Sequence, residues 1–162
     1  MLKPKSLLAT LCLSVLALVA FPTQAQLADK KALTLEGAKK IAAAAEAEAI
    51  KNKWNVVIAI VDDGGHLIYL QRMDGTQTGS IDVAVGKAKT AMAFKRPTKV
   101  LEEVVLKNAR TTLLTLGGVV LLEGGIPVKA GDQVIGAVGV SGVTSQQDAQ
   151  VAEAGIAALS TN

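Results

Sequence analysis

Short turns group the β-rich segments of this 162-residue chain into two clusters. The first joins an apolar, β-branched run at 54–61 to a second run at 66–72 through an Asp-Asp-Gly-Gly turn. The second places runs at 119–123, 126–129 and 134–140 only two to four residues apart. A parallel crossover needs a dozen or more residues, so strands within each cluster must be antiparallel. We expect an α/β protein of the α+β type, with helices on one mainly antiparallel sheet of about five strands.

Four helices are expected around these clusters, because apolar residues recur there at helical spacing. The expected N-caps are Thr34, Ser80, Thr98 and Ser145, with Asp148 near the capping-box position of the last helix. Pro97 should end the second helix. The apolar stripe of that helix includes Ala84, Ala88 and Ala91, and Lys87 is placed on or near its polar side.

Residues 1–25 are typical of a cleavable secretory signal peptide. Two lysines precede an apolar run at 7–21, and the small residues Thr23 and Ala25 precede the expected cut. The run is shorter than the ~20 residues of a membrane-spanning helix, which favours cleavage over a retained anchor. The mature protein would be a single domain at 26–162, periplasmic or secreted.

Cleavage would change the charge and the cysteine content of the chain. It removes two lysines and no acids, which lowers the formal net charge from +3 to +1. We therefore expect no affinity for nucleic acid and no stable membrane insertion after cleavage. The only cysteine, Cys12, lies in the signal, so disulfides and thiol nucleophiles are excluded from the mature part.

His66, the only histidine, is the strongest single candidate for chemistry. It follows the Gly-Gly turn at the start of a strand, and an imidazole can serve as acid, base or axial metal ligand. It can equally be a turn residue with no task. No G-x-S-x-G elbow supports a catalytic triad, and one histidine with scattered acids is weak support for zinc.

The charged residues around His66 allow two interpretations each. Asp62 and Asp63 should point to opposite faces of a strand, so turn formation explains them adequately. Arg72 and Asp74 form a surface ion pair, or Arg72 anchors an anion. The polar loop that follows them can form a pocket rim.

Two glycines interrupt the run at 134–140, Gly136 and Gly139. Glycine within a strand indicates close approach by another backbone or by a ligand. The alternatives here are a ligand and a helix packed on the strand. Neither a dinucleotide fingerprint nor a phosphate-binding loop is present.

Several ordered blocks of the chain resemble the GlcG/HbpS family of haem-binding-type proteins, which is related to the C-terminal domain of PduO. The blocks are Val61-Asp62-Asp63-Gly64-Gly65-His66-Leu67, Arg72-Met73-Asp74-Gly75, Gly79-Ser80, Lys87-Ala88-Lys89-Thr90-Ala91, Glu123-Gly124-Gly125-Ile126-Pro127-Val128, Gly136-Ala137-Val138-Gly139-Val140-Ser141-Gly142 and Asp148. The resemblance extends over about 33–159.

This resemblance implies a profilin-like α/β/α sandwich that assembles into homo-oligomers, from dimers to octamers. It implies haem as a cofactor in some members, redox sensing in some, and work beside cobalamin chemistry in the PduO relatives. It also implies a threonine ligand within 87–98, for which Thr90 and Thr98 are the candidates. His66 lies in the matching hairpin turn and is the strongest intrinsic iron ligand.

Three functions remain open on the sequence alone. The first is an exported small-ligand-binding protein that binds haem or a related tetrapyrrole through His66. Its role would be in haem handling or redox sensing. The second is an enzyme acting on a small organic acid, with His66 as general base and Arg72 holding a carboxylate. The third is an oligomeric interaction module for a membrane sensor or transporter.

Overall fold

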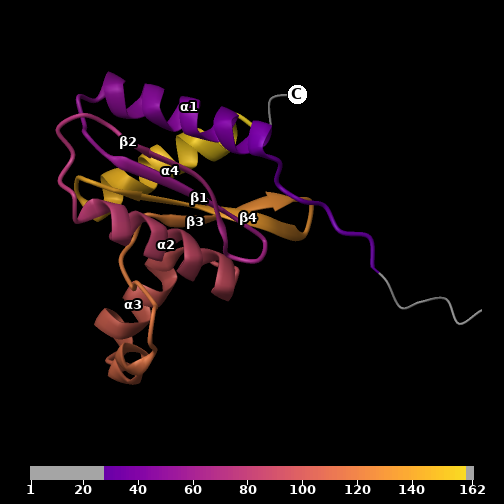
Figure 1. The fold of residues 1–162 in the computed structure, drawn as a ribbon. Helices are drawn as coiled ribbons and strands as arrows, with labels where there is room; N and C mark the ends of the chain where they lie inside the picture. The colour runs from indigo at the N-terminus through magenta and orange to yellow at the C-terminus, as the bar shows by residue number, and fades with distance from the viewer. Residues whose placement is uncertain (1–27, 160–162) are drawn as a thin grey trace, which may run out of the picture.

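Four antiparallel strands form the central sheet of the computed structural model, which describes residues 28–159 (Figure 1). The strands are β1 (Val57–Asp62), β2 (Leu67–Arg72), β3 (Gly125–Ala130) and β4 (Gln133–Ser141). Their order across the sheet is β2-β1-β4-β3, and each neighbouring pair is antiparallel. Antiparallel pairing between β1 and β2 and between β3 and β4 is as expected, and β1 and β4 join the two pairs at the centre of the sheet.

Helices cover both faces of this sheet and make it the middle layer of an α/β/α sandwich (Figure 1). They are α1 (Leu35–Lys51), α2 (Ser80–Phe94), α3 (Thr98–Asn108) and α4 (Ser145–Ala157), with a short 3-10 helix η1 (Thr111–Thr115). α1 and α4 lie together on one face, and α2 lies on the other. α3 and η1 project away from the sandwich beyond α2 (Figure 1).

The strand expected at 119–123 is wrong, so the sheet has four strands rather than about five. Threonine hydroxyl groups hold this segment beside α2 and α3. Val120 N–H donates to Thr90 Oγ1 at 2.9 Å, and Thr98 Oγ1 donates to the carbonyl of Leu122 at 2.6 Å. A run of apolar residues indicates burial, but it does not specify whether neighbouring strands or side chains satisfy the backbone.

β1 is buried on both faces, as its continuous apolar sequence predicts. Ile58 and Ile60 belong to the larger hydrophobic cluster, which includes residues of α1 and α4. Val57 and Ala59 alternate with them and pack with Ala84 of α2. The core therefore lies on both sides of the sheet and is built from small and medium aliphatic side chains.

Gly139 is required by the helix above it. A Cβ atom there would lie 2.0 Å from the carbonyl oxygen of Ala84 and 2.5 Å from the backbone nitrogen of Ala88. The backbone of α2 therefore rests almost directly on β4. Of the two interpretations of this glycine, helix packing is the one that the structure supports.

The observed helix N-caps match the expected ones only in part. Thr34 caps α1 through a hydrogen bond from Gly37 N–H, as expected. Ser80 and Thr98 are instead the first residues of α2 and α3, and neither caps its helix. The cap of α4 is Thr144, which forms a capping box with Gln147. Asp148 is thereby left for a different partner.

Candidate functional site

A tight turn between β1 and β2 fixes the position of His66. Asp62 Oδ1 accepts hydrogen bonds from the backbone N–H groups of Gly64, at 2.9 Å, and His66, at 2.8 Å. Gly65 has φ +79°, a conformation that favours glycine. Asp62 therefore builds the turn, and the turn presents the histidine ring at the surface.

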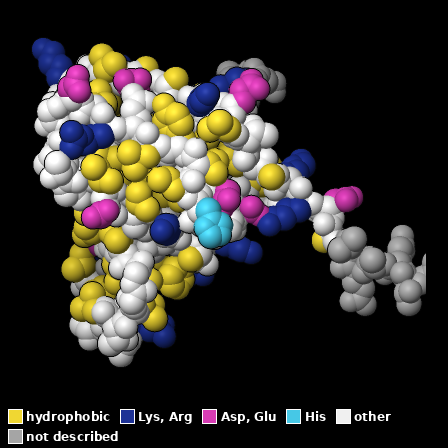
Figure 2. Space-filling model, viewed as in Figure 1, with side chains coloured by type: hydrophobic (Ala, Val, Ile, Leu, Met, Phe, Trp, Pro, Cys, Tyr) yellow, Lys and Arg dark blue, Asp and Glu magenta, His cyan; other side chains and the backbone are white. Residues whose placement is uncertain are grey.

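The ring of His66 borders a concavity of about 430 Å³, here called the His66 concavity. The β1–β2 turn forms one wall through residues 63–66, and the C-terminal half of α2 forms the other. The residues from α2 and its C-terminus are Lys89, Met92, Ala93 and Lys95. Figure 2 shows the histidine exposed on this face, with acidic and basic side chains beside it. The fold thus brings Met92 into the same concavity as His66, although 26 positions separate them in the sequence.

A second concavity of about 410 Å³ adjoins the first and is here called the N-terminal concavity. The two share Asp63, Met92 and Lys95, and the second adds residues 28–30 and 132–134. Two features hold the 28–31 segment in place. Lys30 forms an ion pair with Asp63, and the backbone of Lys31 exchanges two hydrogen bonds with the side chain of Gln133.

Arg72 does not share the site with His66. The two residues lie at opposite ends of β2, and six residues of extended chain span roughly 20 Å. Arg72 is exposed and borders neither concavity. An enzyme in which His66 abstracts a proton while Arg72 holds the carboxylate of the same small substrate therefore has no support from this geometry.

Thr90 and Thr98 are buried and already hydrogen-bonded. Thr90 Oγ1 accepts from Val120 N–H, while Thr98 Oγ1 donates to Leu122 and accepts from Gly125 N–H at 2.9 Å. Neither side chain lines the His66 concavity. Both threonines fix the segment that connects η1 to β3.

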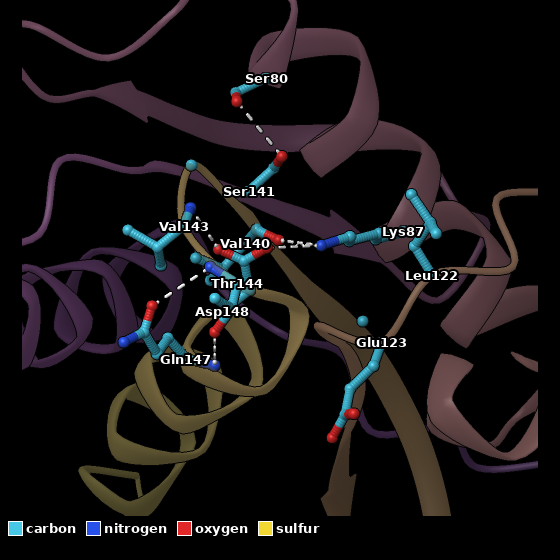
Figure 3. A network of polar contacts seen from close by, with 12 residues as sticks. Ser80, Lys87, Leu122, Glu123, Val140, Ser141, Val143, Thr144, Gln147 and Asp148 are labelled. Carbon is cyan, nitrogen blue, oxygen red and sulfur yellow. Dashed lines mark hydrogen bonds and ion pairs between the residues drawn. The ribbon is translucent and has the colours of Figure 1, made fainter.

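A buried ion pair that was not expected from the sequence connects α2 to α4 (Figure 3). Lys87 Nζ lies 2.7 Å from Asp148 Oδ2 and 2.9 Å from the carbonyl oxygen of Val140. The two side chains are 2% and 3% exposed. Lys87 was expected on or near the polar side, yet it lies three residues after Ala84 and four before Ala91. That spacing places it within the apolar stripe, which was the signal available in the sequence.

Burial raises the pKa of the Asp148 carboxyl above its ordinary value, and the hydrogen bond and charge of Lys87 act in the opposite direction. Asp148 Oδ1 also accepts a hydrogen bond from Val143 N–H at 3.2 Å. A Cβ at Gly124 would lie 2.8 Å from Lys87 Nζ and 2.9 Å from Asp148 Cβ. The backbone of Gly124 therefore packs directly against the ion pair. The pair is built as an internal connection rather than as an open site.

Neither a metal cluster nor a membrane span is found in the described part of the chain. Within residues 28–159, no three histidine, cysteine, aspartate or glutamate side chains gather as metal ligands. No helix there is long and apolar enough to cross a bilayer.

Comparison with known proteins identifies the family. Residues 33–157 match the family model described as "Haem degrading protein HbpS-like". The chain is 48% identical over 112 residues to Protein GlcG of Escherichia coli strain K12, covering 69% of this chain and 83% of GlcG. The chain belongs to the GlcG/HbpS family.

Solved structures agree with this assignment. A double mutant of Streptomyces reticuli HbpS superimposes with a TM-score of 0.77 at 36% identity, covering 83% of this chain and 92% of that one. A complex of PduOC with haem superimposes with a TM-score of 0.72 at 32% identity, covering 79% and 95%. The expected fold and the expected relation to PduO are both confirmed.

Proposed function

We propose that this chain is an exported protein that binds haem or a related tetrapyrrole in the His66 concavity, for haem handling or redox sensing. One observation carries the proposal: the only histidine borders a concavity of about 430 Å³. That volume lies in the range of about 300–1,000 Å³ that small-molecule sites occupy. The haem complex of PduOC and the haem-degrading description of the family model support this choice of ligand.

The residues around the concavity fit the chemistry of haem. An imidazole is a common axial ligand of haem iron, and His66 is exposed and free to take that role. Met92 and Ala93 offer apolar contact to a flat ring, while the ammonium groups of Lys89 and Lys95 suit its propionates. Haem, when bound, supplies the redox chemistry, and the protein supplies orientation and charge.

Titration of the purified protein, residues 26–162, with haemin tests this proposal. We expect a saturable Soret band that His66→Ala shifts or abolishes, because the axial nitrogen is removed. Metal-free protoporphyrin is the matched control, since it lacks iron and should bind both proteins alike. A haemin spectrum with no saturable band, or one that His66→Ala leaves unchanged, would contradict the proposal.

Export remains part of the proposal, and residues 1–25 lie outside the described residues. Its support is the sequence pattern of a positive start, an apolar run and small residues before the cut. We expect expression in a bacterial host to yield a periplasmic protein beginning at Gln26. Intact mass of the purified protein checks this, and retention of residues 1–25 would refute it.

Assembly into a homo-oligomer is proposed as well, through the projecting α3–η1 arm. Leu106, Leu114 and Leu116 of this arm are 74%, 65% and 42% exposed. Leu114 and Leu116 also line a concavity of about 270 Å³ whose lining residues are all leucine or valine. Exposed apolar surface of this kind is typical of protein–protein contacts.

Sedimentation analysis of Leu114→Lys tests the assembly. We expect this variant to dissociate while its thermal unfolding changes little, because the side chain is largely exposed. Ile50→Lys is a matched control on α1, where Ile50 is 60% exposed away from the arm. A monomeric wild-type protein, or dissociation of the Ile50 variant alone, would refute the role of the arm.

A further inference from the structure

Lys95 occupies an unusual backbone position at the end of α2. It is the C-cap residue, with φ 51° and ψ 36°, in the left-handed region that favours glycine. A glycine there would end the helix with less strain. The Cβ of Lys95 therefore adds steric strain to the backbone that a glycine would not have.

Location, rather than backbone strain, distinguishes this lysine. Lys53, which follows the C-cap Asn52 of α1, also has a positive φ, 59°, and borders neither concavity. Lys95 lines both the His66 concavity and the N-terminal concavity. Its ammonium group is thus carried by the rim that the two concavities share.

Charge at this shared rim is available for a ligand. Asp63, the acid common to both concavities, is already paired with Lys30. Within residues 28–159, Lys95 and Lys89 form no ion pair, and both are exposed. The remaining acids, Asp29 and Asp132, line only the N-terminal concavity. The His66 concavity therefore presents two free cations against one neutralised acid.

We infer that Lys95 is a specificity-determining residue, which selects ligands that carry a carboxylate reaching the shared rim. A flat ring bound beside His66 would direct that carboxylate toward the ammonium of Lys95. The inference rests on the proposed function and adds the class of ligand: an anionic, carboxylate-bearing tetrapyrrole rather than a neutral one. An exposed ion pair of this kind changes affinity by roughly two- to five-fold.

The experiment compares haemin with its dimethyl ester, whose carboxylates are blocked, on wild type, Lys95→Gly and Lys95→Arg. We expect Lys95→Gly to bind haemin roughly two- to five-fold more weakly and the ester as well as wild type does. Lys95→Arg keeps the charge and should retain wild-type affinity for both. Raised salt should weaken wild-type binding of haemin toward that of Lys95→Gly.

Lys53→Gly is the matched control, since it makes the same chemical change at another lysine of positive φ away from the site. Both glycine variants should raise the thermal midpoint by about 2–4 °C, and only Lys95→Gly should lose haemin affinity. Equal haemin affinity of Lys95→Gly and wild type, or an equal loss for the ester, would overturn the inference and leave haem binding intact. A wild-type protein that binds no haemin would overturn the proposed function and this inference with it.

Discussion

Lys87 Nζ lies 2.7 Å from Asp148 Oδ2 and thereby connects α2, on one face of the sheet, to α4, on the other (Figure 3). The contact is made at the edge of β4, where β3 has just begun. Val140 N–H donates to the carbonyl of Gly124, whereas the carbonyl of Val140 accepts from Lys87. The ammonium group takes the place of the backbone donor that a longer β3 would supply.

Removing one partner of this pair should strongly destabilise the protein. Lys87→Met leaves Asp148 buried without its cation, and we expect a loss of about 3–5 kcal/mol in the free energy of unfolding. Lys87→Met combined with Asp148→Leu should recover most of that loss, because two apolar side chains need no charge partner. Urea unfolding of the wild type, both single variants and the double variant measures the coupling. Additive losses would show that the two groups do not stabilise each other.

The cost of Lys87→Met should increase with pH. Burial raises the pKa of Asp148, so the folded protein keeps this proton to higher pH than the unfolded chain. The contribution of Asp148 to stability therefore falls as the pH rises above 3.8, which is the ordinary pKa of an aspartate carboxyl. Without Lys87 the pKa rises further, and the stability gap between wild type and variant widens as pH rises. Unfolding free energies measured from pH 4 to pH 8 would show this, and a constant gap would contradict it.

Gly139→Ala should test the close approach of α2 to β4. The added Cβ would meet the backbone of Ala84 and Ala88 at 2.0 and 2.5 Å, and backbone cannot move as a flexible side chain can. We expect a loss of about 3 kcal/mol. Gly117→Ala is the control, because no atom lies within 4 Å of its Cβ. Thermal unfolding that is equally unaffected in both variants would show that the helix can move away.

Thr98→Val should weaken the fold and leave haemin binding unchanged. The variant removes the hydroxyl that serves the part-buried carbonyl of Leu122 and the buried N–H of Gly125. Leaving the buried N–H unpaired costs about 1–3 kcal/mol, and loss of the bond to Leu122 adds to that cost. Thr90→Val leaves only Val120 N–H unpaired and should cost less. A changed haemin Soret band in either variant, at a temperature where it is fully folded, would instead identify that threonine as a ligand-contacting residue.

The sheet could be predicted from turn lengths and apolar runs, because those features act locally. Antiparallel pairing within each cluster, burial of β1 and the Thr34 cap all follow from residues close in sequence. The segment at 119–123 could not be predicted in the same way. Its backbone partners, Thr90 and Thr98, lie more than 20 positions away, and only the folded chain brings them there.

For the candidate site too, features set by residues close in sequence could be predicted, and contacts between distant residues could not. The position of His66 after a tight turn was visible in the sequence, and the turn formed as expected. Its neighbours Met92 and Lys95 come from another helix, and no local pattern connects them to a hairpin. The charge of Lys87 favours a polar helix face, whereas its helical spacing places it in the apolar stripe of α2. Helical spacing indicates that Lys87 is buried, but its partner, Asp148 on α4, is identified only by the fold.

The tight seating of α2 on β4 has a consequence for how a ligand would be received. Because Gly139 lets the two backbones touch, a shift of α2 across β4 would disrupt the close packing on that face of the sheet. The sheet thus positions the backbone of the wall that carries Lys89 and Met92 before any ligand arrives. Binding would then order mainly the exposed side chain of Lys89, and a backbone already in place favours affinity without large contact area.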